Sequence, residues 1–232
     1  MSATVPFPVH AAAPAQDMPR PRFGLLLVAL LATLVVQGAA PVGDLQRVIV
    51  SALVGATLVL ALRVGNARSW LLGAAVIAAA ALVVATSIEA AAAGGNATLS
   101  TSVANALLVG AAPPAVVLGV IRAMRREGRI PVEAVIGVLC LYLLFGMFCA
   151  FVWAVLNRVD GPFFAGGQAG NASDFQYFSF VTLTTVGYGD LTARSALGHT
   201  LAVLEALVGQ IYLVTVVSLF VTNVGRARAR GG

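Results

Sequence analysis

The chain has 232 residues, of which 59% are hydrophobic and 10% are charged, and its mean hydropathy is +0.95. A water-soluble domain carries about 25% charged residues, so this composition excludes a soluble globular protein and predicts a membrane protein. The net charge of +5 would suggest a nucleic-acid partner for a soluble protein, but here membrane topology explains it and we expect no nucleic acid to bind.

Residues 1–22 contain five prolines and no hydrophobic periodicity, which predicts a disordered cytoplasmic tail. Six apolar segments follow, and a membrane-spanning helix needs about 17 to 25 residues. The last four segments meet that length, the first is borderline and the second is short. The segments cover residues 23–40, 48–62, 70–88, 103–121, 134–156 and 200–224.

The first apolar segment has two interpretations. Arg20 and Arg22 precede it and "QGAAP" ends it, a pattern that also fits a cleaved signal peptide. We favour a retained helix, and either interpretation places residue 41 outside the cell.

Arginine placement predicts the orientation of the six spans. With the N-terminus inside, eleven arginines lie in the cytoplasm and three lie outside, as the positive-inside rule requires. Both termini are then cytoplasmic, including the basic tail 226–232, and the Arg-rich cytoplasmic segments would attract anionic lipids. All basic residues are Arg and none is Lys, which is typical of a GC-rich bacterial genome, so we expect the bacterial inner membrane. The three outside arginines are Arg47, Arg158 and Arg194.

Residues 23–130 form the first predicted unit, a four-span membrane region. "RAMRREGR", residues 122–129, suggests the end of a voltage sensor, but such sensors carry their arginines within the fourth span. The segment 103–121 has no charge, so we interpret the cluster as a cytoplasmic anchor and the region as lacking gating arginines. Pro113 and Pro114 are expected to kink or break this span.

The stretch between the last two spans is the second informative region. Irregular backbone persists at membrane depth only where it is buried in protein or lines a water-filled path. Ser173 and Gln176 form an S-x-x-Q capping box, with Asp174 in the first turn. These residues predict a short re-entrant helix that begins near Ser173 and ends near Thr184.

"TLTTVGYGD", residues 182–190, follows this helix. Gly187 and Gly189 permit backbone angles closed to other residues, which would let successive carbonyls point in one direction. A column of carbonyls with a helix C-terminus behind it suits a dehydrated monovalent cation. One chain supplies one column, so a ring of ligands requires several copies around an axis. A phosphate-binding loop would need a Lys followed directly by a Ser or Thr after the glycines, and the chain contains no Lys.

This run contains the T-V-G-Y-G signature, and residues 131–225 resemble the pore domain of the tetrameric potassium channels. The resemblance implies that backbone carbonyls of four chains, with the Thr185 hydroxyl, replace the hydration shell of K⁺. The implied selectivity filter consists of Thr185, Val186, Gly187, Tyr188 and Gly189, with K⁺ bound at the carbonyls of the first four.

The resemblance also implies residues that support the filter. Thr184 precedes it, and Asp190 ties its end to the surroundings at the outer mouth. Tyr188 is expected to point away from the pore and to pack against Tyr177 and Phe178. Those two residues stand where voltage-gated members often have two tryptophans.

A further departure is Val181, which replaces a glutamate that pairs with the filter aspartate in some members. These changes alter the surroundings of the filter and leave its carbonyl column intact.

The last span carries the remaining candidates. By resemblance, Gly209 is the gating glycine of the inner helix. Glu205, one turn before it, is an ionisable residue within a membrane span, where a charge costs free energy. For Glu205 we weigh a functional role against a structural hydrogen bond to the re-entrant helix, and favour the second. The expected lining of the inner cavity consists of Gln210, Leu213, Val217 and Val221.

The predicted fold is therefore an all-α membrane protein with six transmembrane helices and a re-entrant pore helix and filter loop between the last two. The predicted function is passive, potassium-selective conduction by a homotetramer that is not voltage-gated, with K⁺ as permeant ion, no other cofactor and no enzymatic activity. The alternatives are a weakly selective cation channel, and a non-conducting scaffold or auxiliary subunit with a vestigial pore.

Overall fold

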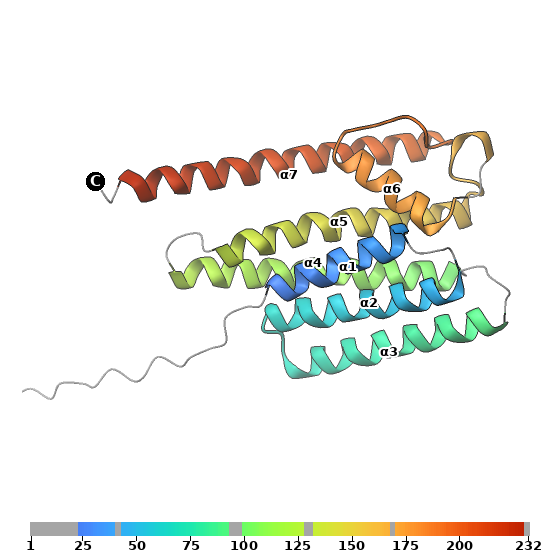
Figure 1. Cartoon of the computed structure of the whole chain (residues 1–232), viewed down its shortest axis with the longest axis horizontal. Coiled ribbons are helices and arrows are strands. Elements are labelled where there is room, and N and C mark those ends of the chain that lie inside the picture. Colours follow the sequence, from blue (N-terminus) through green and yellow to red (C-terminus); the bar gives the residue numbers. More distant parts are fainter. Residues whose placement is uncertain (1–22, 40–42, 93–98, 128–131, 168–169, 230–232) are drawn as a thin grey trace, which may run out of the picture.

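The structure is a computed structural model that describes residues 23–39, 43–92, 99–127, 132–167 and 170–229 (Figure 1). Within these ranges all regular structure is helical, apart from an isolated bridge between Phe164 and Ala193. The predicted disordered tail, residues 1–22, lies outside them. The elements are α1 (Phe23–Ala39), α2 (Asp44–Val64), α3 (Ser69–Ala92), α4 (Leu99–Glu127), α5 (Val132–Val159), the 3₁₀ turn η1 (Ala165–Gly167), α6 (Ala172–Leu183) and α7 (Ala196–Ala229).

Five of these helices, α2 to α5 and α7, are long and apolar enough to cross a membrane. The expectation that the second segment is short is wrong, because α2 has 21 residues. Asp44 in its first turn and Arg63 in its last turn complement the helix dipole and extend the helix beyond the apolar run. With 17 residues, α1 stays at the borderline that its sequence predicts.

The fourth span is one continuous helix, with Pro113 and Pro114 both inside α4. The two prolines therefore do not break it. Neighbouring helices compensate for lost helical hydrogen bonds in membrane proteins, and α4 packs against α2, α3 and α5.

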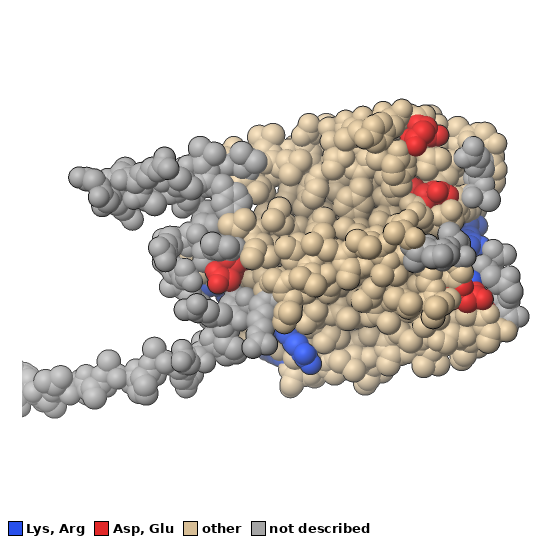
Figure 2. Space-filling model, viewed as in Figure 1, with Lys and Arg blue, Asp and Glu red and all other residues tan. Residues whose placement is uncertain are grey.

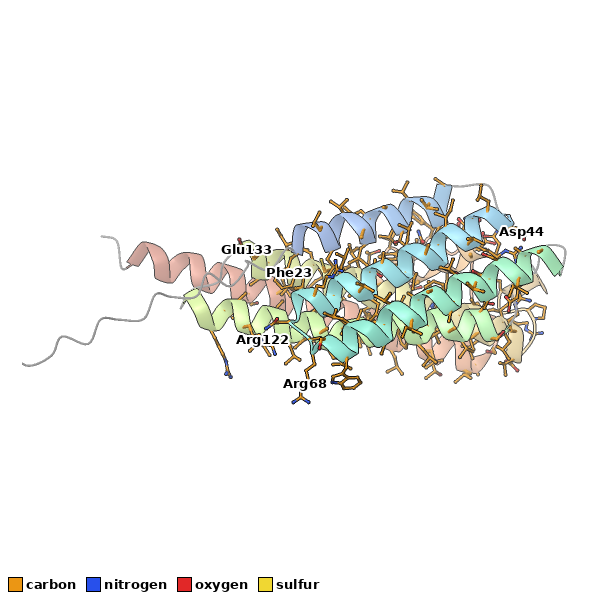
Figure 3. All side chains as sticks on the ribbon, turned by 90° about the horizontal axis from the view of Figure 1, so that it is seen from below. Phe23, Asp44, Arg68, Arg122 and Glu133 are labelled. Carbon is orange, nitrogen blue, oxygen red and sulfur yellow. The ribbon has the colours of Figure 1, made fainter. Side chains whose placement is uncertain are left out.

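The long helices α1 to α5 and then α7 run in alternating directions (Figure 1), so the charged residues gather at the two ends of the bundle. Phe23, Arg68, Arg122 and Glu133 lie at one end and Asp44 at the other (Figure 3). On the face shown in Figure 2, a band without charged residues separates the two ends. The pore-side elements α6 and the loops around it lie at the end opposite the C-terminus of α7 (Figure 1).

A continuous apolar core joins α1, α2, α4 and α5. Phe23, Leu26 and Leu30 of α1 are fully buried in it, and α1 packs against α2, α5 and α6. The core extends from the four-span region into α5 of the predicted pore domain without interruption.

The outer helices α3 and α7 are much less covered. The fraction buried within the apolar span is 44% in α2, α4 and α5, but 17% in α3 and 11% in α7. These two helices lie on opposite sides of the molecule (Figure 1).

Candidate functional site

The short helix α6 begins one residue earlier than its sequence suggests, at a different cap. Asn171 is the N-cap: its side chain accepts a hydrogen bond from the Asp174 backbone N–H at 3.0 Å, and the Asp174 carboxylate accepts one from the Asn171 backbone N–H at 2.9 Å. The predicted capping box of Ser173 and Gln176 is therefore wrong. The pattern N-x-x-D satisfies the same two backbone donors two residues earlier.

Ser173 and Gln176 instead hold α6 against α1. The Ser173 hydroxyl donates to the Gly38 carbonyl at 3.2 Å, and the Gln176 amide donates to the Leu34 carbonyl at 2.9 Å. Gln37 of α1 adds a third bond, from its side-chain amide to the Ala172 carbonyl at 3.2 Å. The pore helix is thus positioned by the first helix of the same chain, more than 130 residues earlier in sequence.

The chain reverses direction directly after α6. Thr184 is the C-cap, and its hydroxyl donates to the Phe180 carbonyl at 2.6 Å. The backbone N–H groups of Val186 and Gly187 both donate to the Val181 carbonyl, at 3.0 and 3.3 Å. The Val181 carbonyl, in the last turn of α6, therefore accepts hydrogen bonds from two backbone N–H groups of the predicted filter.

The backbone of the filter alternates in handedness. Thr185, Gly187 and Gly189 have positive φ angles of 59°, 55° and 80°, whereas Val186 and Tyr188 do not. Positive φ is costly for a β-branched residue such as Thr185, and backbone strain of this kind concentrates at functional sites. Alternation of left- and right-handed residues turns successive carbonyls to the same side instead of to opposite sides as in a strand.

The carbonyls of Thr185, Val186, Gly187 and Tyr188 accept no hydrogen bond from the described part of the chain. All four residues are exposed. A carbonyl without a protein donor is available to water or to a cation, and exposure leaves the column accessible to either.

Tyr188 and Asp190 are both linked to Tyr177 on α6. The rings of Tyr177 and Tyr188 are stacked, with centroids 6.5 Å apart and an interplanar angle of 4°. The Tyr177 hydroxyl donates to the Asp190 carboxylate at 2.8 Å. This bond raises the pKa of Tyr177 above its ordinary value of 10.0, so the hydroxyl remains a donor at neutral pH. Tyr177 thereby supplies the partner for Asp190 that Val181 cannot supply.

Among the described residues Tyr188 has a ring contact with Tyr177 and none with Phe178, so the expected packing against Phe178 is wrong, and Phe178 lies in a different aromatic cluster. It packs edge-on against Trp153, Phe163 and Phe164, with centroid distances of 5.5 to 5.7 Å. This aromatic cluster fixes α6 to α5 and to the loop that follows α5.

Glu205 of α7 is 3% exposed and lies behind α6. Its carboxylate accepts hydrogen bonds from the Ser179 hydroxyl at 2.5 Å and from the Trp153 indole N–H at 3.1 Å. Glu205 therefore joins α7 to both α6 and α5, which agrees with the structural alternative that we favoured for it.

Gly209 lies where α7 crosses the end of α6. A Cβ atom at this position would come within 2.3 Å of the Leu183 carbonyl oxygen, so only glycine allows this approach. α7 is helical through Gly209. Of the expected cavity residues, Gln210 and Leu213 are exposed, while the side chains of Val217 and Val221 lie outside the described residues.

The contacts of α1 with α6 are the functional arrangement that sequence reasoning missed. Amide side chains at Gln37 and Gln176 within apolar surroundings were the available signal, because a polar group at such a depth needs a partner.

Comparison with known proteins adds one finding. Residues 137–226 match the model of a protein family described as an ion channel. The match covers most of α5, all of α6 and most of α7, the elements that carry the predicted filter and its predicted supports. It supports an ion-channel domain in a multi-pass membrane protein. No curated protein and no solved structure matches the chain.

Proposed function

We propose that the chain forms a potassium-selective channel that conducts K⁺ passively through a filter of backbone carbonyls. The alternating backbone at Thr185, Gly187 and Gly189 carries this proposal. An alternating backbone of this kind would turn the carbonyls of the proposed filter to one side, and the N–H groups of Val186 and Gly187 donate to the Val181 carbonyl. Backbone oxygen is the ligand that replaces the hydration shell of K⁺ in selective filters.

The proposed channel is a homotetramer. A single chain contributes one column of carbonyls, and an ion in the pore needs such columns on all sides. Two exposed surfaces support assembly. An open groove of about 470 Å³ lies beside the filter, with Phe180, Val186 and Tyr188 in its lining.

The second surface is an apolar stripe on α7. Its residues recur at the spacing of one helix face, and their exposed fractions are 52% to 65%. An exposed apolar face of this length requires lipid or another copy of the chain against it. The stripe consists of Val203, Leu207, Ile211 and Val214.

We further propose that the filter faces the outside of a bacterial inner membrane, with both termini in the cytoplasm. Arg68 and Arg122 lie at the end of the bundle opposite Asp44 (Figure 3). In the expected topology this end carries eleven arginines against three at the other, so the positive-inside rule assigns it to the cytoplasm. α6 lies at the other end (Figure 1).

The experiment is ion flux into liposomes that contain the purified protein. We expect K⁺ uptake that Ba²⁺ blocks and that Na⁺ does not replace. Equal Na⁺ uptake would instead indicate a weakly selective cation channel. Absence of flux over a range of voltage and pH would indicate a non-conducting scaffold or auxiliary subunit.

A further inference from the structure

A chain of buried polar groups lies behind α6 and joins it to both of its neighbouring helices. Trp153, Ser179 and Glu205 are each at most 3% exposed. Trp153 Nε1 lies 3.1 Å from Glu205 Oε2, and Ser179 Oγ lies 2.5 Å from Glu205 Oε1. Ser179 Oγ also lies 2.7 Å from the carbonyl oxygen of Gly146. The chain of contacts therefore begins and ends on α5 and passes through α7 and α6.

The number of protons in this chain does not fit an ionised Glu205. Both contacts of Ser179 are at hydrogen-bond distance between two oxygens, so each needs a proton. A serine hydroxyl carries one proton and a backbone carbonyl carries none. If Glu205 is ionised, Ser179 can donate to Glu205 or to Gly146, but not to both. A proton shared between the two acceptors would be aligned with neither, which weakens both bonds.

One proton on Glu205 satisfies every contact. The indole N–H of Trp153 can only donate, so Glu205 Oε2 accepts from it and the proton lies on Oε1. Glu205 Oε1 then donates to the Ser179 oxygen, and the Ser179 hydroxyl donates to the Gly146 carbonyl. No two lone pairs face each other in this arrangement.

The surroundings of Glu205 contain no positive charge that would favour its ionised form. On α5 the titratable groups that face it are Cys149, which is hydrogen-bonded to it, and Tyr142. On α6 its partner is Ser179. None of these groups is a cation, and Glu205 forms no salt bridge among the described residues. A buried carboxylate without a cation is unfavourable, and the neutral form is adopted instead.

Ser179 contacts α5 at a point where the two helices are close together. A Cβ atom at Gly146 would lie 2.8 Å from the Phe180 ring, so no side chain separates α5 from α6 there. If Glu205 lost its proton, the Ser179 hydroxyl would turn toward the carboxylate. The oxygens of Ser179 and Gly146 would then face each other without a proton, and their repulsion would separate α6 from α5.

We propose that Glu205 is a proton-binding site whose neutral form fixes α6 to α5 and α7. At neutral pH Glu205 donates to Ser179, which reverses the direction that this hydrogen bond has with an ionised carboxylate. At alkaline pH the proton is lost, the link from Ser179 to Gly146 breaks, and α6 is held less firmly. The bound proton is independent of conduction, whereas its effect on the pore rests on the proposed channel function.

The first test is infrared spectroscopy of the purified full-length protein in liposomes. The C=O stretch of a neutral carboxyl group absorbs at a higher frequency than the bands of a carboxylate. At neutral pH we expect one such band that moves to lower frequency in D₂O and is lost in Glu205→Gln. Glu89→Gln is the control, because Glu89 is a hydrogen-bonded glutamate near the end of α3, and it should retain the band. Identical spectra of wild type and Glu205→Gln in this range would overturn the proposal.

A second variant tests the direction of the bond to Ser179. In Ser179→Ala the neutral carboxyl group loses its acceptor, so its band should persist and move to higher frequency. An unchanged frequency, or loss of the band, would show that Glu205 does not donate to Ser179 and would overturn the proposal. Glu205→Gln can accept from Trp153 and donate to Ser179, so it keeps the hydrogen bonds of the neutral form. The comparison of wild type with Glu205→Gln therefore decides the matter even if Ser179→Ala does not fold.

The last test follows the band and K⁺ flux in the same liposomes as the pH is raised. In wild type and in Glu89→Gln we expect the flux to fall together with the band. In Glu205→Gln, which has no carboxyl group to ionise, the flux should not change over this range of pH. Wild-type flux that persists after the band is lost, or that falls equally in Glu205→Gln, would overturn the link to α6. If no variant conducts at any pH, the proposed channel function fails, and the infrared spectra still decide whether Glu205 carries the proton.

Discussion

The five-helix bundle α1–α5 and the filter with α7 differ in how completely one chain covers them. In the bundle, Phe23, Leu26 and Leu30 are fully buried within a single core. In the predicted pore region, residues 184–190, which include the predicted filter 185–189, are exposed and only 11% of the apolar span of α7 is buried. The core of α1, α2, α4 and α5 is covered within one chain, whereas the predicted filter and α7 present backbone and apolar surface for other molecules, and α3 resembles α7 in its exposure. Substitutions matched between the two regions test this difference.

The largest effect is expected at Gly187. Gly187 and Gly166 both have positive φ and open space where a Cβ atom would lie, so alanine at either costs about 1–2 kcal/mol of backbone strain. We expect Gly187→Ala to abolish K⁺ selectivity or conduction while the tetramer still assembles, because it changes the direction of a filter carbonyl. Gly166→Ala, in the turn before α6, should preserve both. Liposome flux of K⁺ and Na⁺ with size-exclusion chromatography measures this, and unchanged selectivity in Gly187→Ala would refute the filter assignment.

A smaller effect, on stability, is expected at Gly209. Alanine there would approach the Leu183 carbonyl oxygen to 2.3 Å, and overpacking of this kind costs about 1–3 kcal/mol. The control is Gly73→Ala in α3, where nothing lies within 4 Å and helix propensity predicts a gain of up to about 1 kcal/mol. The midpoint of thermal unfolding in detergent should therefore fall in Gly209→Ala and rise in Gly73→Ala. A stabilised Gly209→Ala variant would show that α7 does not press against the end of α6.

Glu205 and Glu89 provide a comparison of two carboxyl groups that both form side-chain hydrogen bonds, Glu205 with Ser179 and Trp153 and Glu89 with Ser100 and Thr101. Glu205→Ala leaves the Trp153 indole N–H without an acceptor in a buried site, which should cost about 2–4 kcal/mol with the cavity it creates. Glu205→Gln can accept from Trp153 and donate to Ser179, and should change stability by less than about 1 kcal/mol. Glu89→Ala, at the less buried end of α3, should also cost less than about 1 kcal/mol. Equal losses in the two alanine variants would contradict a structural role for Glu205.

Composition and motif together predicted much of this molecule, for identifiable physical reasons. Long apolar runs determine where helices lie in a membrane protein, and the glycines of the filter indicate a backbone that other residues cannot adopt. The amides of Gln37 and Gln176 indicated that polar partners were needed, but not which ones, because the contacts of Gln37, Ser173 and Gln176 each join segments more than 130 residues apart. The cap of α6 was misassigned because two overlapping four-residue patterns, from Asn171 and from Ser173, both fit a capping box. The two prolines of the fourth span lie inside a continuous α4, so their presence in the sequence did not predict a break.

The smallest effect is expected for the dependence of open probability on membrane voltage. A weak dependence would distinguish the four-span region from a voltage sensor. No charged residue lies within 103–121 of α4, and Arg122 and Arg125 follow that stretch as exposed side chains near the end of the helix. One charge that crossed the membrane field would contribute about 2.3 kcal/mol per 100 mV, about a fiftyfold change in the ratio of open to closed channels. We therefore expect a nearly flat open probability over about 200 mV in planar bilayers, unchanged in Arg122→Gln and Arg125→Gln. A steep conductance–voltage relation that either substitution flattens would show that α4 moves these arginines through the field. The four-span region would then act as a voltage sensor.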